Sequence, residues 1–234
     1  MKTIWALFDD ATRSVYNAFK DNPKYQVRSI GINDLKEPNY YKIDLGLTNE
    51  NLIEELKKLP KPDIILASPP CESWSLADCS GRLILDINEQ GIVQQNKIYY
   101  DSYNETSHPC KRRDFFKKMS KKINGENTVL GLVKVLDFFK PKHWVIENPR
   151  SSLIWKYLKL ILGYDYFEND TYYNAYDESF TVKPTKFLSN KNLNLLNTYK
   201  PNYKIIASLG YNKSSSIPSK LLQTIVSNLE DNKN

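Results

Sequence analysis

Cysteine and histidine are scarce in this chain of 234 residues, which contains three cysteines and two histidines. Three cysteines cannot all pair with one another, and none lies in a Cys-x-x-Cys motif, so a disulfide framework is excluded. Zinc sites are built mainly from these two residue types, and the nearest approach to a ligand cluster is His108-Pro109-Cys110. We therefore expect no metal site and reduced thiols, which leaves a cysteine available for chemistry.

Long apolar runs are also missing. No segment approaches the roughly 20 consecutive apolar residues that a membrane-spanning helix needs. The first residues run directly into a strand-like segment rather than a signal peptide. With 41% hydrophobic and 26% charged residues, the composition is that of a soluble protein with one main domain. We expect a cytoplasmic protein without a membrane partner.

Arginine contributes only 6 of the 33 basic residues, and against 27 acidic residues the formal net charge is +6. A basic chain favours an acidic partner such as nucleic acid, although a solvated basic surface explains the same balance. The excess of lysine, together with abundant Asn, Tyr and Ile, is typical of an AT-rich coding genome, so it indicates more about the source than about the mechanism.

Apolar segments of strand length alternate with segments of helical period along most of the chain. Strands are expected at 3–8, 25–32, 41–44, 63–67 and 143–147, and helices at 14–20, 49–59 and 217–229. A further helix is expected to begin at Thr128 as its N-cap, because apolar residues then repeat at helical spacing until Pro141. Short β-like runs within 164–206 indicate antiparallel strands. The pattern predicts an α/β fold: a mostly parallel twisted sheet with helices on both faces and an antiparallel edge.

Unusual residues fall where three of the expected parallel strands end. Asp9-Asp10 follows the first strand, Pro69-Pro70-Cys71 follows the fourth, and Glu147-Asn148-Pro149 ends the fifth. In open sheets of this kind, ligands bind beyond the carboxyl ends of the strands. The sequence therefore predicts a site at that edge.

Ser68-Pro69-Pro70-Cys71 is the sharpest of these signals. Two prolines fix φ and remove two backbone donors, so they hold the next side chain in a rigid turn. We expect nearby helix N-termini to favour the thiolate of Cys71 relative to an ordinary pKa of about 8.5. The alternative is a small buried cysteine after a strand, the common fate of this residue.

The sequence here resembles the DNA cytosine-5 methyltransferases, particularly small phage-encoded members. The Ser-Pro-Pro-Cys motif with Ser73 and Ser75 is similar to the nucleophile motif of that family, and Glu147-Asn148-Pro149-Arg150 to its glutamate motif. Weaker likenesses are Lys183-Pro184-Thr185-Lys186 with the residues to Asn190, and Ser216-Ile217-Pro218. The matches span nearly the whole chain.

The resemblance implies an S-adenosylmethionine-dependent methyltransferase fold and double-stranded DNA whose target cytosine is flipped out. Cys71 would add to C6 of the base as nucleophile, and Glu147 would assist at N3. Pro70 and Arg150 complete the catalytic residues that it implies.

The segments that bind the cofactor in this family differ here from the family pattern. Residues 7–15 contain no glycine, whereas the family has a Gly-rich turn there. Gly31 stands where an acidic residue commonly binds the cofactor ribose, which leaves Asp34 as a substitute, and Asp44 is a candidate adenine contact. The implied cofactor-binding residues are Phe8, Asp9, Asp10, Asp34, Asp44 and Pro69.

The segment that recognises DNA in this family also differs here from the family pattern. The family's recognition segment corresponds to 190–215, which is too short for a recognition domain and is expected to be vestigial. We expect a catalytic domain over 1–189 with a basic insertion without clear period at 76–126, and a C-terminal helix within 216–234 that returns to it. The expected DNA-binding residues are Ser73, Ser75, Arg112, Arg113, Lys117, Lys118, Lys183 and Lys186, although lysines of the insertion also fit a solvated helix face.

Three alternatives stay open at this stage. A related motif that ends in an aromatic residue serves methylation of exocyclic amino groups, but Cys71 and Glu147 argue against that chemistry. The eroded cofactor turn suits a weak or inactive relative that binds DNA as a regulator or decoy. The motifs do not distinguish DNA from RNA, and they leave the target sequence and oligomeric state open.

Overall fold

The computed structural model describes residues 1–9, 12–74, 83–86, 91–94, 97–109, 112–199, 201 and 215–231. Predictions for Asp10, Ser75, Lys111, Cys79 and Cys110 lie outside these residues.

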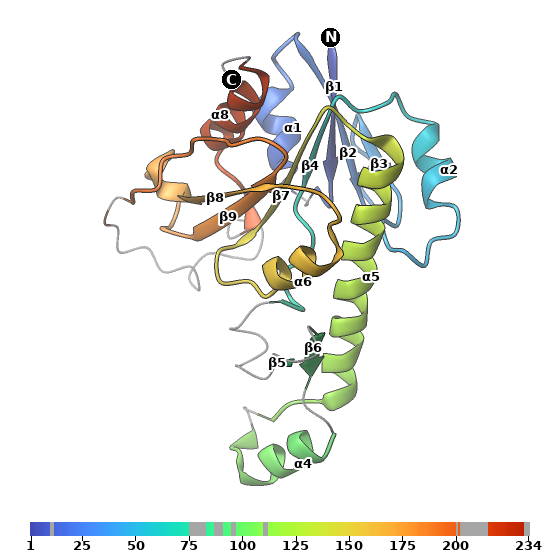
Figure 1. Cartoon of the computed structure of the whole chain (residues 1–234), viewed down its shortest axis with the longest axis vertical. Helices are drawn as coiled ribbons and strands as arrows, with labels where there is room; N and C mark the ends of the chain where they lie inside the picture. The colour runs from blue at the N-terminus through green and yellow to red at the C-terminus, as the bar shows by residue number, and fades with distance from the viewer. Residues whose placement is uncertain are drawn as a thin grey trace.

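Seven strands of the described residues form one sheet, in the order β3-β2-β1-β4-β7-β9-β8 (Figure 1). They are β1 (Lys2–Leu7), β2 (Tyr25–Gly31), β3 (Tyr40–Lys42), β4 (Ile64–Ala67), β7 (His143–Pro149), β8 (Phe167–Tyr172) and β9 (Pro184–Ser189). Neighbours from β3 to β7 are parallel, and β9 is antiparallel to both β7 and β8. The expected mostly parallel sheet with an antiparallel edge region is confirmed.

Helices cover both faces of the sheet, because alternate residues of the central strands are buried on opposite sides. On one side Trp5 and Leu7 pack in a cluster that contains residues of α2 (Leu52–Lys57), α5 (Phe115–Phe139) and α6 (Ile154–Ile161). On the other, Ile4 and Ala6 pack with α1 (Ser14–Phe19) and α8 (Ser219–Glu230). Strands buried on both faces need continuous apolar runs, which explains why they could be read from the sequence.

Helix α5 begins much earlier than expected, so the prediction of an N-cap at Thr128 is wrong. Its N-cap is Asp114, whose side chain accepts a hydrogen bond from the backbone N–H of Lys117. Thr128 lies inside the helix, and its hydroxyl donates to the carbonyl of Asn124 at 2.9 Å. This back-bonding is the other common use of a threonine hydroxyl in helices.

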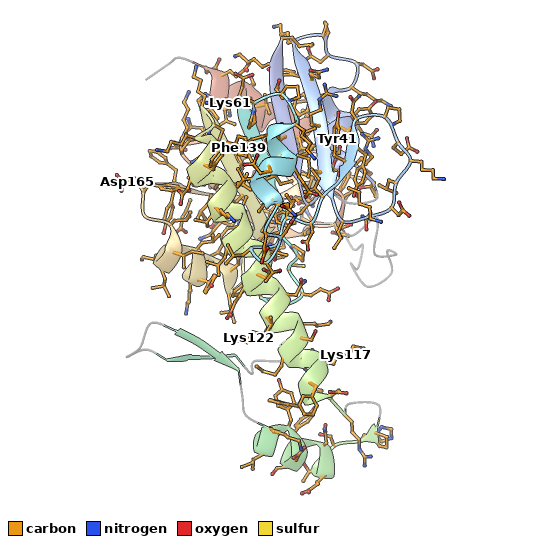
Figure 2. The ribbon with its side chains drawn as sticks, turned by 90° about the vertical axis from the view of Figure 1, so that its right-hand side faces the viewer. Tyr41, Lys61, Lys117, Lys122, Phe139 and Asp165 are labelled. Atoms are coloured by element: carbon orange, nitrogen blue, oxygen red, sulfur yellow. The ribbon has the colours of Figure 1, made fainter. Side chains whose placement is uncertain are left out.

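The first half of α5 extends away from the sheet and carries α4 (Lys97–Thr106) near its tip (Figure 1). Figure 2 shows Lys117 and Lys122 on this part of the helix. A two-stranded hairpin of β5 (Leu83–Asp86) and β6 (Gly91–Gln94) belongs to the same insertion. We call α4, the described residues 112–114, and the first half of α5, up to Glu126, the arm. The insertion at 76–126, in which the sequence shows no clear period, therefore contains strands and helices in its described parts.

The C-terminal helix α8 begins after Pro218 and packs against α1. The backbone N–H of Ile217 donates to the Ser14 hydroxyl, and the Gln223 side chain donates to the carbonyl of Ala18. Within the described residues, no helix has the length and apolar character required to cross a membrane.

Candidate functional site

Strand register brings five segments to one edge of the sheet. Leu7 pairs with Ala67, and Ala67 pairs with Ile146, so the segments after β1 and β4 and the end of β7 lie side by side. Because β9 is antiparallel, its first residues are at the same edge, where Pro184 pairs with Tyr172 at the end of β8. Cys71, Glu147, Tyr173 and Lys183 all lie in or next to these strand ends.

The Cys71 segment is a tight turn, as the two prolines predict. The backbone N–H of Trp74 donates to the carbonyl of Cys71 at 3.0 Å, and Trp74 is buried in the core. The Asn148 side chain donates to the carbonyl of Pro69 at 2.9 Å, which ties this turn to β7. Cys71 itself is an exposed free thiol, so the structure does not support the buried-cysteine alternative.

Glu147 is buried, with 9% of its surface exposed. Its Oε1 accepts a hydrogen bond from the Tyr173 hydroxyl at 3.0 Å. The other oxygen, Oε2, has no hydrogen-bond partner within the described part of the chain. It is therefore available for a hydrogen bond with a substrate atom. The Lys183 ammonium lies 4.6 Å from the centre of the Tyr173 ring, which adds a positive charge to the group.

The thiol of Cys71 differs from expectation. Although part of the Cys71 residue is exposed, the protein atoms packed around its thiol remove water from it and raise its pKa. The negative charge of Glu147 raises the pKa further, and the positive charge of Lys183 lowers it. The expected lowered pKa is therefore wrong for this structure. Cys71 and Glu147 nevertheless belong to neighbouring strand ends, since Ala67 of β4 pairs with Ile146 of β7.

Pro70 is exposed in the Cys71 turn, whereas Arg150 points toward β8. The Arg150 guanidinium donates to the Tyr172 hydroxyl at 3.0 Å and to Oδ1 of Asn197 at 2.8 Å, and its Nε lies 3.5 Å from Oδ2 of Asp170. These contacts give Arg150 a structural role beside the site. Its predicted part in catalysis stays a prediction.

The turn after β1 is built differently from a cofactor cradle. Phe8 adopts a positive φ of 58°, and Asp9 is buried with 7% exposure. Ser29 donates to the Asp9 carboxylate at 2.5 Å, and Ser29 lies 3.4 Å from Nε of the buried Arg13. Asp9 is thus held within the protein, and its position does not support the predicted contact with a cofactor.

The other predicted cofactor residues are distributed around the same edge. Asp34 is exposed and lies 3.7 Å from Nζ of Lys42. Asp44 is exposed, and its Oδ1 accepts from the backbone N–H of Gly46 at 2.9 Å, which leaves Oδ2 for a ligand. Pro69 is buried. Ile32, which sequence reasoning missed, is 69% exposed directly beyond β2 and offers an apolar surface.

The predicted DNA-binding residues fall into two groups. Arg112 and Lys117 are exposed on the arm, and Arg113 and Lys118 are half-buried there. Ser73 is buried and donates to the carbonyl of Lys121 on α5, so a contact with DNA would require the turn to separate from the helix.

Lys186 pairs with Glu168 across β8 and β9. The role of each of these residues in DNA binding stays a prediction.

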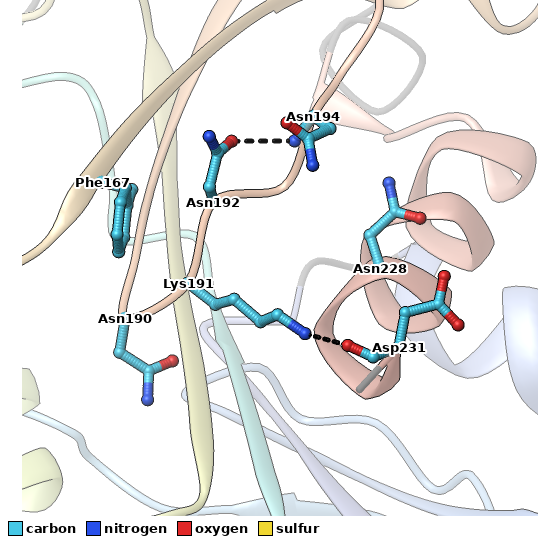
Figure 3. Close-up of a pocket in the computed structure, with 7 residues that line it drawn as sticks. All are labelled: Phe167, Asn190, Lys191, Asn192, Asn194, Asn228 and Asp231. Atoms are coloured by element: carbon cyan, nitrogen blue, oxygen red, sulfur yellow. Dashed lines mark hydrogen bonds between the residues drawn. The ribbon is translucent and has the colours of Figure 1, made fainter. Parts of the chain in front are cut away.

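A separate pocket lies between the end of β9 and α8 (Figure 3). Its lining residues are Phe167, Asn190, Lys191, Asn192, Asn194, Asn228 and Asp231. Several of these side chains already bind the protein: Lys191 donates to backbone carbonyls at the end of α8, and Asn190 donates to the carbonyl of Lys142. It does not include Cys71 or Glu147. No cluster of three or more metal-ligating side chains occurs among the described residues.

Comparisons with known proteins assign no family. No protein-family model matches the sequence, and no curated protein is significantly similar to it. Among solved structures, the chain is similar to EhMeth, a methyltransferase of Entamoeba histolytica, with a TM-score of 0.49 and 15% identity. The match covers 88% of this chain and 59% of that chain. A likeness at this level assigns neither a reaction nor a substrate.

Proposed function

We propose that this chain methylates C5 of cytosine in DNA, with Cys71 as nucleophile, Glu147 as the group that assists at N3, and S-adenosylmethionine as methyl donor. The observation that carries the proposal is that the turn with Cys71 and the end of β7 with Glu147 lie side by side, since Ala67 pairs with Ile146 and the Asn148 side chain donates to the carbonyl of Pro69. The family resemblance of both motifs supports the same assignment.

The chemistry requires both side chains. Cytosine C5 is a weak nucleophile, and addition of the Cys71 thiolate to C6 forms a C–S bond and moves the electron pair of the C5–C6 double bond toward C5. The Glu147 carboxyl, through Oε2, would hydrogen-bond N3 and neutralise the charge that develops on the ring. Loss of the proton from methylated C5 then expels the thiolate and restores the double bond. Because C6 is inaccessible in a duplex, the base has to leave the stack.

When bound, S-adenosylmethionine would supply an electrophilic methyl group to C5, with its S–CH3 bond broken and S-adenosylhomocysteine as the leaving group. The residues that fit its adenosine part are Ile32, through apolar contact with the ring, and Asp44, through its exposed carboxylate. Asp9 is unsuited to the methionine part, because its carboxylate is buried and already hydrogen-bonded to Ser29. We therefore expect weak binding of the cofactor.

The arm supports double-stranded DNA as the partner. Arg112 and Lys117 are exposed on it, and phosphate contacts of this kind supply affinity without sequence information. With 190–215 too short for a recognition domain, we expect a short or loosely read target site.

Transfer of a labelled methyl group to DNA, mapped by bisulfite sequencing, tests the proposal. Cys71→Ser should abolish transfer and leave the melting temperature unchanged, because only thiolate attack is removed. Full activity of that variant would contradict the mechanism. Methylation of RNA but not DNA would correct the substrate.

A second candidate is favoured by the turn after β1. A protein in which Asp9 serves the internal structure could have lost the methyl donor and kept DNA binding, as a regulator or decoy. Calorimetry with S-adenosylmethionine separates the two, since the second candidate predicts no binding of the cofactor.

A further inference from the structure

Tyr173 contacts two side chains of opposite charge at the Cys71 site. Its hydroxyl donates to Oε1 of Glu147 at 3.0 Å, and its ring faces the Lys183 ammonium at 4.6 Å from the ring centre. The three residues come from different segments: Glu147 from β7, Tyr173 from the residue after β8, and Lys183 from the residue before β9.

The Tyr173 side chain is well suited to fix its two neighbours. It is 1% exposed, lies in the core cluster on the α1 side of the sheet, and packs edge-on against Phe180. A buried ring has one position, whereas Glu and Lys side chains in water populate many rotamers. Hydrogen bonding to the first and a cation–π contact with the second therefore reduce their freedom and preorganise the site.

The charges around Cys71 oppose one another. Glu147 from β7 and Glu72 from the cysteine's own turn disfavour the thiolate, and Lys183 favours it. Glu72 is itself paired with Lys121 of α5, at 3.0 Å between the charged atoms. Lys183 and Glu147 therefore have opposite effects on the Cys71 thiol.

We propose that Tyr173 is a positioning residue that holds both the Glu147 carboxyl and the Lys183 ammonium at the Cys71 site, so that Lys183 supplies the positive charge of that site. This inference rests on the proposed function, because it explains how the same site forms the Cys71 thiolate that attacks cytosine. It makes Lys183 part of the Cys71 site rather than a phosphate contact alone.

The test is the pH dependence of Cys71 alkylation by iodoacetamide, followed by peptide-resolved mass spectrometry so that the other two cysteines do not contribute. Lys183→Met should raise the midpoint by about one pKa unit, since an opposite charge nearby typically lowers a pKa by one to three units. Alkylation below the midpoint should then slow about tenfold, because only the thiolate reacts. Lys183→Arg should restore the midpoint of the natural chain.

Lys24→Met is the matched control, because Lys24 is exposed just before β2, at the opposite edge of the sheet. It removes the same charge and should leave the midpoint unchanged. An unchanged midpoint in Lys183→Met, or an equal rise in Lys24→Met, would overturn the role of Lys183.

Two substitutions at Tyr173 separate its contacts. Tyr173→Phe keeps the ring under Lys183 and should leave the alkylation midpoint nearly unchanged, but it should lower kcat of methyl transfer because Glu147 loses its donor. Tyr173→Leu also removes the ring and should shift the midpoint toward that of Lys183→Met. If Tyr173→Leu fails to fold, a Tyr173→Phe variant with unaltered kcat is enough to overturn the role of Tyr173 in holding Glu147.

Alkylation requires neither DNA nor cofactor, so the role of Lys183 and the proposed function fail separately. Shifted midpoints without any methyl transfer would uphold Lys183 as the thiolate's cation and reject the proposed function. Methyl transfer by the natural chain together with an unshifted midpoint in Lys183→Met would uphold the proposed function and reject the role of Lys183.

Discussion

Asn148 connects the turn that carries Cys71 to the strand that carries Glu147, and its replacement should loosen both. The side chain is 1% exposed, and its Nδ2 donates to the carbonyl of Pro69 at 2.9 Å. Asn148→Ala leaves that carbonyl without its donor, which costs about 1–3 kcal/mol in a buried site. The Oδ1 of Asn148 is itself buried without a partner among the described residues, so its removal offsets part of the loss.

We therefore expect Asn148→Ala to destabilise the fold by about 1–2 kcal/mol. For a chain of this length, that corresponds to a fall in melting temperature of about 2–8 °C. Asn148→Asp keeps the size but replaces the donor with a carboxylate, and it should cost about 3 kcal/mol or more at neutral pH.

The two variants should differ in pH dependence. Burial would raise the folded-state pKa of the introduced carboxyl above its unfolded value. Its destabilising effect is then fully present above the folded pKa and disappears as pH falls, because the protonated carboxyl can donate to Pro69. The difference between the melting temperatures of Asn148→Asp and the natural chain should narrow in acid, and that of Asn148→Ala should not.

Asn228→Ala is the control, because the Asn228 amide also donates to a backbone carbonyl, that of Leu193 at 2.6 Å, but on α8. It should lower the melting temperature without altering the alkylation rate of Cys71, whereas Asn148→Ala should alter both. An Asn148→Ala variant that melts and reacts like the natural chain would refute this account of the turn.

Three further predictions concern helix α5, the cofactor and DNA. Gly131→Ala should destabilise the fold by about 2 kcal/mol, because the added Cβ would lie 2.0 Å from the carbonyl oxygen of Leu45 and overpack the site. Denaturant titration measures this change. A variant of equal or greater stability would contradict the close approach. S-adenosylmethionine at a hundredfold excess over Kd should stabilise the fold by about 2.7 kcal/mol, and a thermal melt that does not move at millimolar cofactor would favour the inactive relative. Replacing Arg112, Arg113, Lys117 and Lys118 with Ala should weaken binding to all DNA sequences alike and flatten its salt dependence, by about 0.9 in log–log slope for each phosphate that is no longer neutralised; a strictly read site that survives this change would place recognition elsewhere.

The sheet could be predicted because its central strands are buried on both faces and therefore consist of apolar runs that end in polar residues. The same reasoning placed Cys71 and Glu147 at one edge, since the carboxyl ends of parallel strands coincide. The first half of α5 could not be found in this way. It extends away from the sheet, so its exposed residues, such as Phe116 and Ile123, follow no core-facing period.

The position of Tyr173 and the pKa of the Cys71 thiol could not be predicted from the sequence for a different reason. Tyr173 is 26 residues from Glu147, and it reaches the carboxyl only because β9 pairs with both β7 and β8. The pKa of Cys71 depends on which charges the fold brings near, and the motif gives no information on Lys183. Segments rich in tyrosine and asparagine around 164–206 signalled strands but not which tyrosine would face the site.

The catalytic and cofactor halves of the site are held by different interactions, so one can be lost while the other persists. Cys71 and Glu147 are joined through Asn148 and the Pro69 carbonyl, and none of these contacts involves the turn after β1. That turn is stabilised by Ser29, which donates to Asp9. If the Asp9 carboxylate moved outward to bind a cofactor, it would lose the hydrogen bond from Ser29. That loss would lower the free energy of unfolding. Asp9→Asn should therefore lower the stability of the protein more than its affinity for S-adenosylmethionine, and the opposite result would show that Asp9 turns outward when the cofactor binds.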